Sequence, residues 1–121
     1  LKKKGAVTLH NIELTINEED YLPVPTPDSK IILQALYQIL KTQPDLKIRI
    51  EGHTSSDGEK KNNQAASLTH AKNLKRWLAV KGIPFTRLKA VGLADSIPIT
   101  TNQLAEGKAI NNRIEIKIIT P

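Results

Sequence analysis

The sequence predicts one α+β (or α/β) sandwich domain, in which helices cover one face of a four-stranded mixed sheet in the order β-α-β-α-β-loop-β. Three observations support this prediction. Several short segments alternate apolar and polar residues, two longer segments carry apolar residues three and four positions apart, and Pro, Gly, Asn and Asp separate the segments. At 121 residues, the chain is long enough to bury a core without disulfides or a metal.

The first strand is expected within residues 7–16, where Ile12, Leu14 and Ile16 alternate with polar residues. Residues 21–27 contain three prolines, each of which fixes φ and removes a backbone donor, so a stiff extended connection is expected there. Thr26 is suited to cap the following helix, with Pro27 at its first position.

The first helix is expected over residues 28–42, followed by a strand that ends at a ligand-binding edge. The predicted buried stripe of the helix is Ile31, Ile32, Ala35, Leu36, Ile39 and Leu40. In the strand, Leu46, Ile48 and Ile50 alternate with charged residues. Its carboxyl end leads into residues 52–55, and ligands often bind at such ends.

The second helix is expected over residues 61–81, with Gly82 as its C-terminal stop. Its predicted inward residues are Leu68, Ala71, Leu74, Trp77 and Leu78. Residues 87–93 form the third predicted strand, and the alternation of Ile114, Ile116 and Ile118 marks the fourth. A loop-rich stretch between them includes a short helix at residues 102–112.

Composition indicates an ordinary globular domain, with 39% hydrophobic and 25% charged residues. The net charge of +6 is a weak sign of an anionic partner, because the lysines are scattered and lack the interleaved aromatic residues that stack on bases. Nucleic-acid binding is therefore not predicted. No apolar run is long enough to span a membrane, so membrane attachment is expected only through a segment outside this chain.

Several spaced motifs together resemble the OmpA-like domain family. They are Ile-Glu-Gly-His-Thr-Ser at residues 50–55, Asn-Gln-Ala-Ala-Ser-Leu-Thr-His-Ala at 63–71, Gly-Leu-Ala-Asp-Ser-Ile-Pro at 92–98 and Glu-Gly-Lys-Ala-Ile-Asn-Asn-Arg at 106–113. The resemblance runs from about residue 11 to 119. It implies a mixed sheet backed by helices, and a bacterial cell-envelope module that grips peptidoglycan.

Two positions depart from the family pattern. The family has Asp where this chain has Ser55, and Arg where it has His70. In the family these charged residues hold the ammonium and the carboxylate of a diamino acid in the peptidoglycan stem peptide. Serine provides no charge, and histidine lacks the bidentate geometry of arginine, so the resemblance implies binding that is weak, altered or lost.

Four further residues are candidates for the same ligand pocket. Thr54 and Asn63 match family positions that line the pocket, although Thr and Asn also commonly satisfy loop backbone. Asp57 offers a substitute carboxylate, but it is at least as well explained as a turn residue before Gly58. Arg113 offers a cation for the anionic end of the ligand, and a structural ion pair explains it equally well.

No catalytic or metal site is predicted. His53 is expected to be a structural, hydrogen-bonded histidine, and His10, His53 and His70 lack the spacing of metal ligands. The sequence contains no phosphate loop, nucleophile elbow or cysteine. We therefore expect neither an enzyme nor a cofactor.

The resemblance implies that residues 1–121 form a single OmpA-like domain excised from a longer cell-envelope protein. We expect it in the periplasm, attached to the outer membrane through another part of that protein, with the peptidoglycan stem peptide as its partner. The alternative is a vestigial pocket on a domain that acts as a structural or protein–protein interaction module in the envelope.

Overall fold

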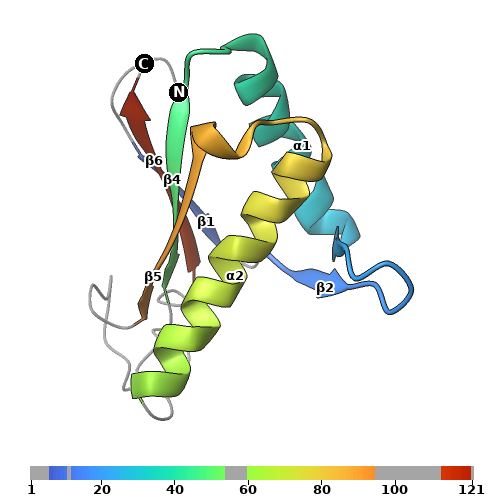
Figure 1. Ribbon diagram of the computed structural model, residues 1–121, viewed down its shortest axis with the longest axis vertical. Helices are drawn as coiled ribbons and strands as arrows, with labels where there is room; N and C mark the ends of the chain where they lie inside the picture. Colours follow the sequence, from blue (N-terminus) through green and yellow to red (C-terminus); the bar gives the residue numbers. More distant parts are fainter. Residues whose placement is uncertain (1–5, 11, 54–59, 95–112, 121) are drawn as a thin grey trace.

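The computed structural model describes residues 6–10, 12–53, 60–94 and 113–120 (Figure 1). Its strands are β1 (Ala6–His10), β2 (Leu14–Ile16), β3 (Pro23–Pro25), β4 (Lys47–His53), β5 (Leu88–Ala94) and β6 (Arg113–Thr120). Its helices are α1 (Pro27–Thr42), α2 (Lys60–Val80) and the short 3₁₀ helix η1 (Phe85–Arg87). The short helix predicted at residues 102–112 lies outside the described residues.

The main sheet has four strands in the order β1-β6-β4-β5. The strand pair β4 and β5 is parallel, whereas β6 runs antiparallel to both β1 and β4. The first and last strands of the chain are therefore neighbours in space. This mixed sheet confirms the predicted fold class.

A second, two-stranded sheet was not predicted. The expected first strand is divided, because β1 ends at His10 and the chain then enters β2, which pairs antiparallel with β3. The proline-rich segment that we expected to be a plain connection supplies β3, with Pro23 and Pro25 opposite Ile16 and Leu14. Proline is tolerated in such a strand at positions that donate no ladder hydrogen bond.

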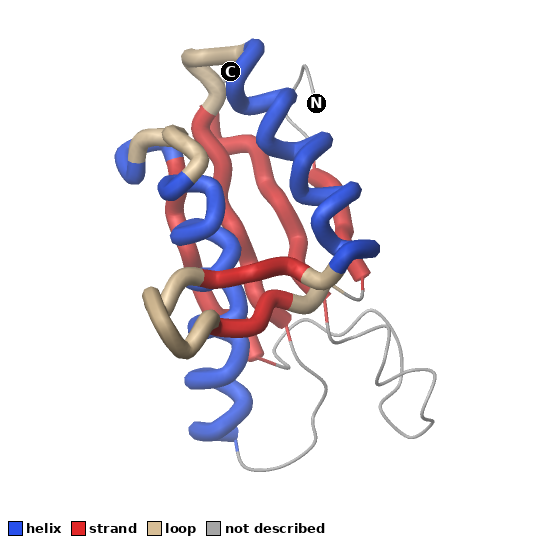
Figure 2. The backbone as a smooth tube through the Cα atoms, turned by 90° about the vertical axis from the view of Figure 1, so that its right-hand side faces the viewer, coloured by secondary structure: helices blue, strands red, loops and turns tan. Residues whose placement is uncertain are grey.

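Both helices lie on the same side of the main sheet (Figure 2). The residues that they bury are mostly aliphatic, and Trp77 is the one aromatic residue among the buried core positions of the described chain. The predicted inward residues of α2 are confirmed at four positions, while Leu68 is only half-buried. Gly82 lies just after α2 with a φ of 112°, a backbone conformation that favours glycine, as predicted for a residue that stops the helix.

The predicted start of α1 is confirmed, but its predicted buried stripe is partly wrong. The Thr26 side chain caps the helix by accepting a hydrogen bond from the Ser29 backbone N–H. The buried residues are Ser29, Leu33, Leu36 and Leu40, whereas Ile31, Ile32 and Ala35 are exposed. Two faces of this helix carry apolar residues at helical spacing, so periodicity alone did not identify the one that packs.

Arg87 joins the end of α1 to the strand that follows it. Its guanidinium donates to the carbonyl oxygens of Leu40, Gln43 and Leu46 at 2.8, 2.7 and 2.9 Å. The last carbonyls of a helix have no partner within the helix, so this side chain satisfies groups that would otherwise need water. Arg87, which was expected to begin the third strand, therefore fixes the turn that leads into β4.

Candidate functional site

The predicted site lies at the end of the sheet where β4 finishes. His53 is the last residue of β4 and stands opposite Arg113, the first residue of β6. In the sequence, residues 54–59 follow β4 and α2 begins directly after them at Lys60. The predicted candidates Thr54, Ser55 and Asp57 lie outside the described residues.

A network of charged side chains occupies the sheet face opposite the helices. Ile48 and Ile50 belong to the core on the helix side, so the alternate residues of β4, including Glu51 and His53, point the other way. Glu51 and Glu115 are partners in the antiparallel register of β4 and β6. Two carboxylates directly opposite each other would repel unless cations accompanied them.

Three cations accompany this carboxylate pair. Arg49 Nε donates to Glu51 Oε2 at 2.7 Å, and Arg113 Nε donates to Glu115 Oε2 at 2.6 Å. Lys117 Nζ lies 3.1 Å from Glu115 Oε1. Glu51 and Arg113 are each only 2% exposed, so these pairs are held in a low-dielectric environment where losing one partner is costly.

His53 completes the network as a buried neutral residue. Its Nε2 lies 3.2 Å from Glu51 Oε1 and 3.6 Å from Glu115 Oε2, and the residue is 2% exposed. Burial lowers the pKa of His53 below 6.5, and the hydrogen bond to Glu51 only partly opposes this effect. The prediction that His53 is a hydrogen-bonded structural histidine agrees with this geometry.

Glu115 is held in its charged form. Burial by itself raises the pKa of this carboxyl group, but the hydrogen bonds from Lys117 and Arg113, together with the nearby positive charge of Arg113, outweigh burial and place its pKa below 4.5. With a neutral His53, the two carboxylates face the three cations Arg49, Arg113 and Lys117. The network is thus close to charge balance without any bound ion.

One triad of potential metal ligands occurs in the part of the chain that the structure describes. Ligand atoms of Glu51, His53 and Glu115 lie within 4.8 Å of one another. Each carboxylate is already paired with a guanidinium or ammonium group, so a divalent ion would have to displace these cations or share their charge at short range. We therefore assign no metal to this triad.

His70 is tied to the backbone of another segment. It lies in α2, about 15 Å along the helix axis from Lys60, and its Nε2 is 2.8 Å from the carbonyl oxygen of Ile12. A carbonyl oxygen only accepts, so the proton must be on Nε2 and the imidazole is the donor. The neutral form of this tautomer leaves a lone pair at Nδ1.

The described candidates do not form one cluster of ligand-binding groups. Arg113 is buried in the ion pair with Glu115, as the structural alternative predicted, and it has a further interaction besides. His70 is half-buried and hydrogen-bonded to the carbonyl oxygen of Ile12. Asn63 lies in the first turn of α2, and its side chain lies outside the described residues.

Sequence analysis missed the acidic half of the network. Neither Glu51 nor Glu115 was predicted to be a site residue, whereas the structure buries Glu51 and leaves Glu115 partly buried. A signal was present, because Arg49-x-Glu51-x-His53 and Arg113-x-Glu115-x-Lys117 alternate charges at strand spacing. Opposite charges two residues apart lie on the same face of one strand, and this spacing gives the pairs Arg49–Glu51 and Arg113–Glu115.

Comparison with known proteins identifies the family of this fold. A sequence model of the OmpA family matches residues 22–113, from the proline-rich segment to the first residue of β6. The match covers most of the chain and includes the positions of Ser55 and His70. The chain belongs to the OmpA family.

Individual relatives agree with this assignment. Outer membrane porin F of Pseudomonas fluorescens is 29% identical over 107 residues, which cover 88% of this chain and 33% of the porin. The peptidoglycan-binding protein ArfA of Mycobacterium bovis is 33% identical over 87 residues, covering 72% of this chain and 27% of ArfA. The chain thus spans about a third or less of the length of these two relatives.

Solved structures confirm the fold. The peptidoglycan-associated lipoprotein of Burkholderia pseudomallei superimposes with a TM-score of 0.75 at 22% identity, covering 96% of this chain and 90% of the lipoprotein. The names of these relatives describe a porin, a peptidoglycan-binding protein and a lipoprotein, in agreement with the prediction that the domain is not an enzyme. Among the described residues, neither helix has the length and apolar character needed to cross a membrane.

Proposed function

We propose that this chain is a periplasmic OmpA-family domain that associates non-covalently with peptidoglycan through a weakened stem-peptide pocket. The observation that carries the proposal is the family match over residues 22–113, which contains every motif of the predicted pocket. ArfA, a relative named for binding peptidoglycan, aligns with 72% of the chain. Attachment to the outer membrane would be supplied by another part of a longer protein.

The proposed pocket lies where β4 leads into residues 54–59, with Ser55 and His70 in place of the family's charged pair. Ser55 accepts a hydrogen bond from the ammonium of the diamino acid without a charge of its own. A charge-assisted hydrogen bond is about twice as strong as a neutral one, so recognition at this end is weakened. Thr54, Asp57 and Asn63 complete the proposed pocket, and Arg113 supports it from the buried network.

The bond from His70 to Ile12 limits what the ring offers to a carboxylate. Nε2 is already used as a donor, and neutral Nδ1 presents a lone pair that a carboxylate oxygen would repel. The neutral ring therefore offers no further donor to the carboxylate end of the ligand, so recognition at this end is weakened as well.

The same bond favours a second candidate function. A histidine that fastens α2 to the segment after β1 contributes to the structure whether or not a ligand is present. The domain would then be a structural or protein-interaction module that has kept the fold and lost the pocket. The two candidates differ in whether the wild-type domain is retained on peptidoglycan.

Co-sedimentation with purified sacculi at pH 7.5 tests the proposal. The wild-type domain is compared with Ser55→Asp/His70→Arg, which rebuilds the charge pair fifteen residues apart. The matched control is Thr86→Asp/Gln38→Arg, which makes the same charge changes at exposed positions.

Weak wild-type retention and a gain of about tenfold or more in the Ser55→Asp/His70→Arg variant support the pocket, since restoring a charged contact is worth at least about 1.4 kcal/mol. Retention of the variant alone assigns the wild type to the second candidate. If neither protein sediments above the control, peptidoglycan association through these positions is refuted.

A further inference from the structure

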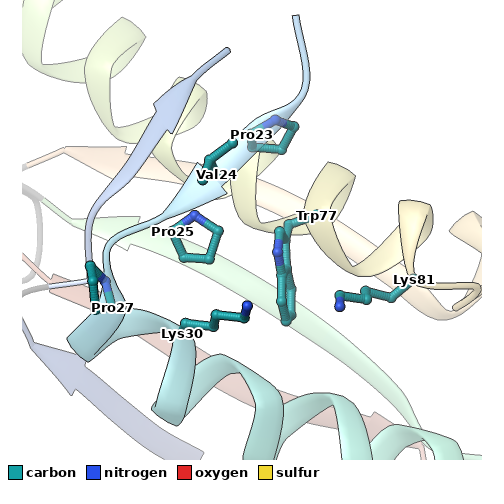
Figure 3. Close-up of a pocket in the computed structure, with 7 residues that line it drawn as sticks. All are labelled: Pro23, Val24, Pro25, Pro27, Lys30, Trp77 and Lys81. Atoms are coloured by element: carbon teal, nitrogen blue, oxygen red, sulfur yellow. The ribbon is translucent and has the colours of Figure 1, made fainter. Parts of the chain in front are cut away.

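A hollow on the surface lies between the β2–β3 hairpin and the two helices, away from the end of the sheet at His53 (Figure 3). Its volume is about 500 Å³, which falls within the usual range for small-molecule sites. Its lining residues are Pro23, Val24, Pro25, Pro27, Lys30, Trp77 and Lys81. None of them belongs to the proposed peptidoglycan pocket, so a ligand in this hollow is independent of peptidoglycan association.

The wall formed by β3 is apolar, and its two prolines cannot donate backbone hydrogen bonds. Pro23 and Pro25 have no backbone N–H, and Val24 between them is 44% exposed. An added peptide strand would need backbone donors along this strand, so strand addition is disfavoured here. A ligand in the hollow must be recognised by side chains.

The side chains that point into the hollow are one indole and two ammonium groups. Lys30 from α1 and Lys81, the residue that follows α2, extend toward Trp77 from opposite sides (Figure 3). Lys81 Nζ lies 5.3 Å from the centre of the indole ring. Trp77 is 6% exposed, so its body belongs to the core and only an edge is available to a ligand.

The two lysines carry charge that the described part of the chain does not neutralise. No acidic residue among those that the structure describes forms an ion pair with Lys30 or Lys81, and the aromatic contact of Lys81 leaves its charge uncompensated. Two cations directed at one small apolar hollow repel each other. An anion bound in the hollow that both lysines line would be attracted by both, while an apolar body attached to it would cover the prolines and the indole edge.

We propose that this hollow binds a carboxylate that carries a compact apolar body. The carboxylate is attracted by the ammonium groups of Lys30 and Lys81, which line the same hollow, and the apolar part packs on Pro25, Val24 and the edge of Trp77. This chemistry is offered both by a free carboxylic acid and by a peptide C-terminus with an apolar last residue. The source is decided by comparing one probe of each kind.

Trp77 is the only tryptophan of the chain, so its fluorescence and its single indole N–H signal in NMR both report on this hollow. The probes are cyclohexanecarboxylate and N-acetyl-L-leucine, neither of which carries an aromatic chromophore. Cyclohexanecarboxamide is the neutral counterpart of the first probe and has nearly the same shape. Each is titrated into the wild-type domain at pH 7.5.

We expect saturable shifts of the indole signal with a Kd in the millimolar range, as is usual for ligands of about ten heavy atoms. The amide should bind at least about tenfold more weakly than the carboxylate, because it loses the charge-assisted contacts. Tighter binding of N-acetyl-L-leucine assigns the hollow to a peptide end, and tighter binding of cyclohexanecarboxylate assigns it to a free acid.

The variant Lys30→Gln/Lys81→Gln removes both cations and should weaken carboxylate binding about tenfold or more while leaving amide binding unchanged. The single variant Lys89→Gln removes an exposed lysine that does not line the hollow and should bind like the wild type. Thermal unfolding of each variant verifies that it is folded. Equal affinity for carboxylate and amide, undiminished binding in the double variant, or no shift with either acid would overturn the proposal.

Discussion

Gly52 and Gly92 are partners in the parallel register of β4 and β5, and α2 lies so close above both that neither position has room for a side chain. A Cβ atom at Gly52 would lie 2.0 Å from the carbonyl oxygen of Ser67. One at Gly92 would lie 2.6 Å from the backbone nitrogen of Leu68. The two glycines thus determine how closely α2 approaches the strand that carries the predicted site.

Replacing Gly52 by alanine should destabilise the domain by about 3 kcal/mol, because the helix backbone must move to accommodate one methyl group. Urea unfolding followed by circular dichroism measures the change in the free energy of unfolding. Thr69→Ala changes an exposed residue of the same helix and should have an effect within about 0.5 kcal/mol. Equal stability of Gly52→Ala and wild type would show that the contact is looser than described.

Replacing His70 by leucine should cost about 1–2 kcal/mol, since the buried segment at Ile12 loses the donor to its carbonyl. His70→Gln keeps an amide N–H that reaches in the same direction, so it should recover part of this loss. Differential scanning calorimetry of the three proteins provides the comparison. If leucine and glutamine are equally destabilising, the hydrogen bond is not the cause.

Acidification should destabilise the domain in two pH ranges, one set by His53 and one by Glu115. The pKa of His53 in the folded protein is below 6.5, so its contribution to stability is fully present above pH 6.5 and is lost as the pH falls toward the folded value. The pKa of Glu115 is below 4.5, so its contribution is lost further down, as the pH falls from 4.5 through the folded value. Both pKa values are lowered in the folded protein, so protonation of either group makes the domain less stable as the pH falls.

Free energies of unfolding measured from pH 8 to pH 5 should therefore decrease on acidification below about pH 6.5. His53→Gln keeps an N–H donor for Glu51 but does not titrate, so its curve should be flatter in this range. Parallel curves for this variant and the wild type would assign the acid sensitivity to other groups.

Replacing Arg87 by methionine should destabilise the domain by about 3 kcal/mol, because three carbonyl oxygens between the last turn of α1 and the start of β4 lose a charged donor. Arg76→Met is the matched control, because Arg76 is exposed on α2 and no ion pair or hydrogen bond of its side chain is present among the described residues. Amide hydrogen exchange should show faster exchange in the last turn of α1 in Arg87→Met only. Unchanged exchange there would mean that solvent replaces the arginine at no cost.

Elements with one clear periodicity could be predicted from the sequence. Strand β4 (Lys47–His53), the inward face of α2 and the cap at Thr26 each follow from local patterns. For α1 the sequence offered two apolar faces, and the choice between them depends on where the β2–β3 hairpin and α2 lie. Such information comes from tertiary contacts and is absent from the helix's own sequence.

The site was less predictable for a different physical reason. Residue types at Ser55 and His70 identified the departures from the family motif, but a motif does not reveal the hydrogen bond from His70 to Ile12, which joins positions 58 residues apart. The burial of Glu51 likewise depends on the register of β4 against β6. Long-range pairing decides both, and no local pattern encodes it.

The pairing of β1 with β6 also determines how the domain responds to mechanical load. Ala6 is opposite Lys117, and His10 is opposite Arg113 at the end of the sheet where β4 reaches His53. Tension applied between the Ala6 end of β1 and a ligand held at the His53 end pulls these strands along their own axes. All five residue pairs of the β1–β6 ladder then share the force in shear, instead of opening one after another from an end.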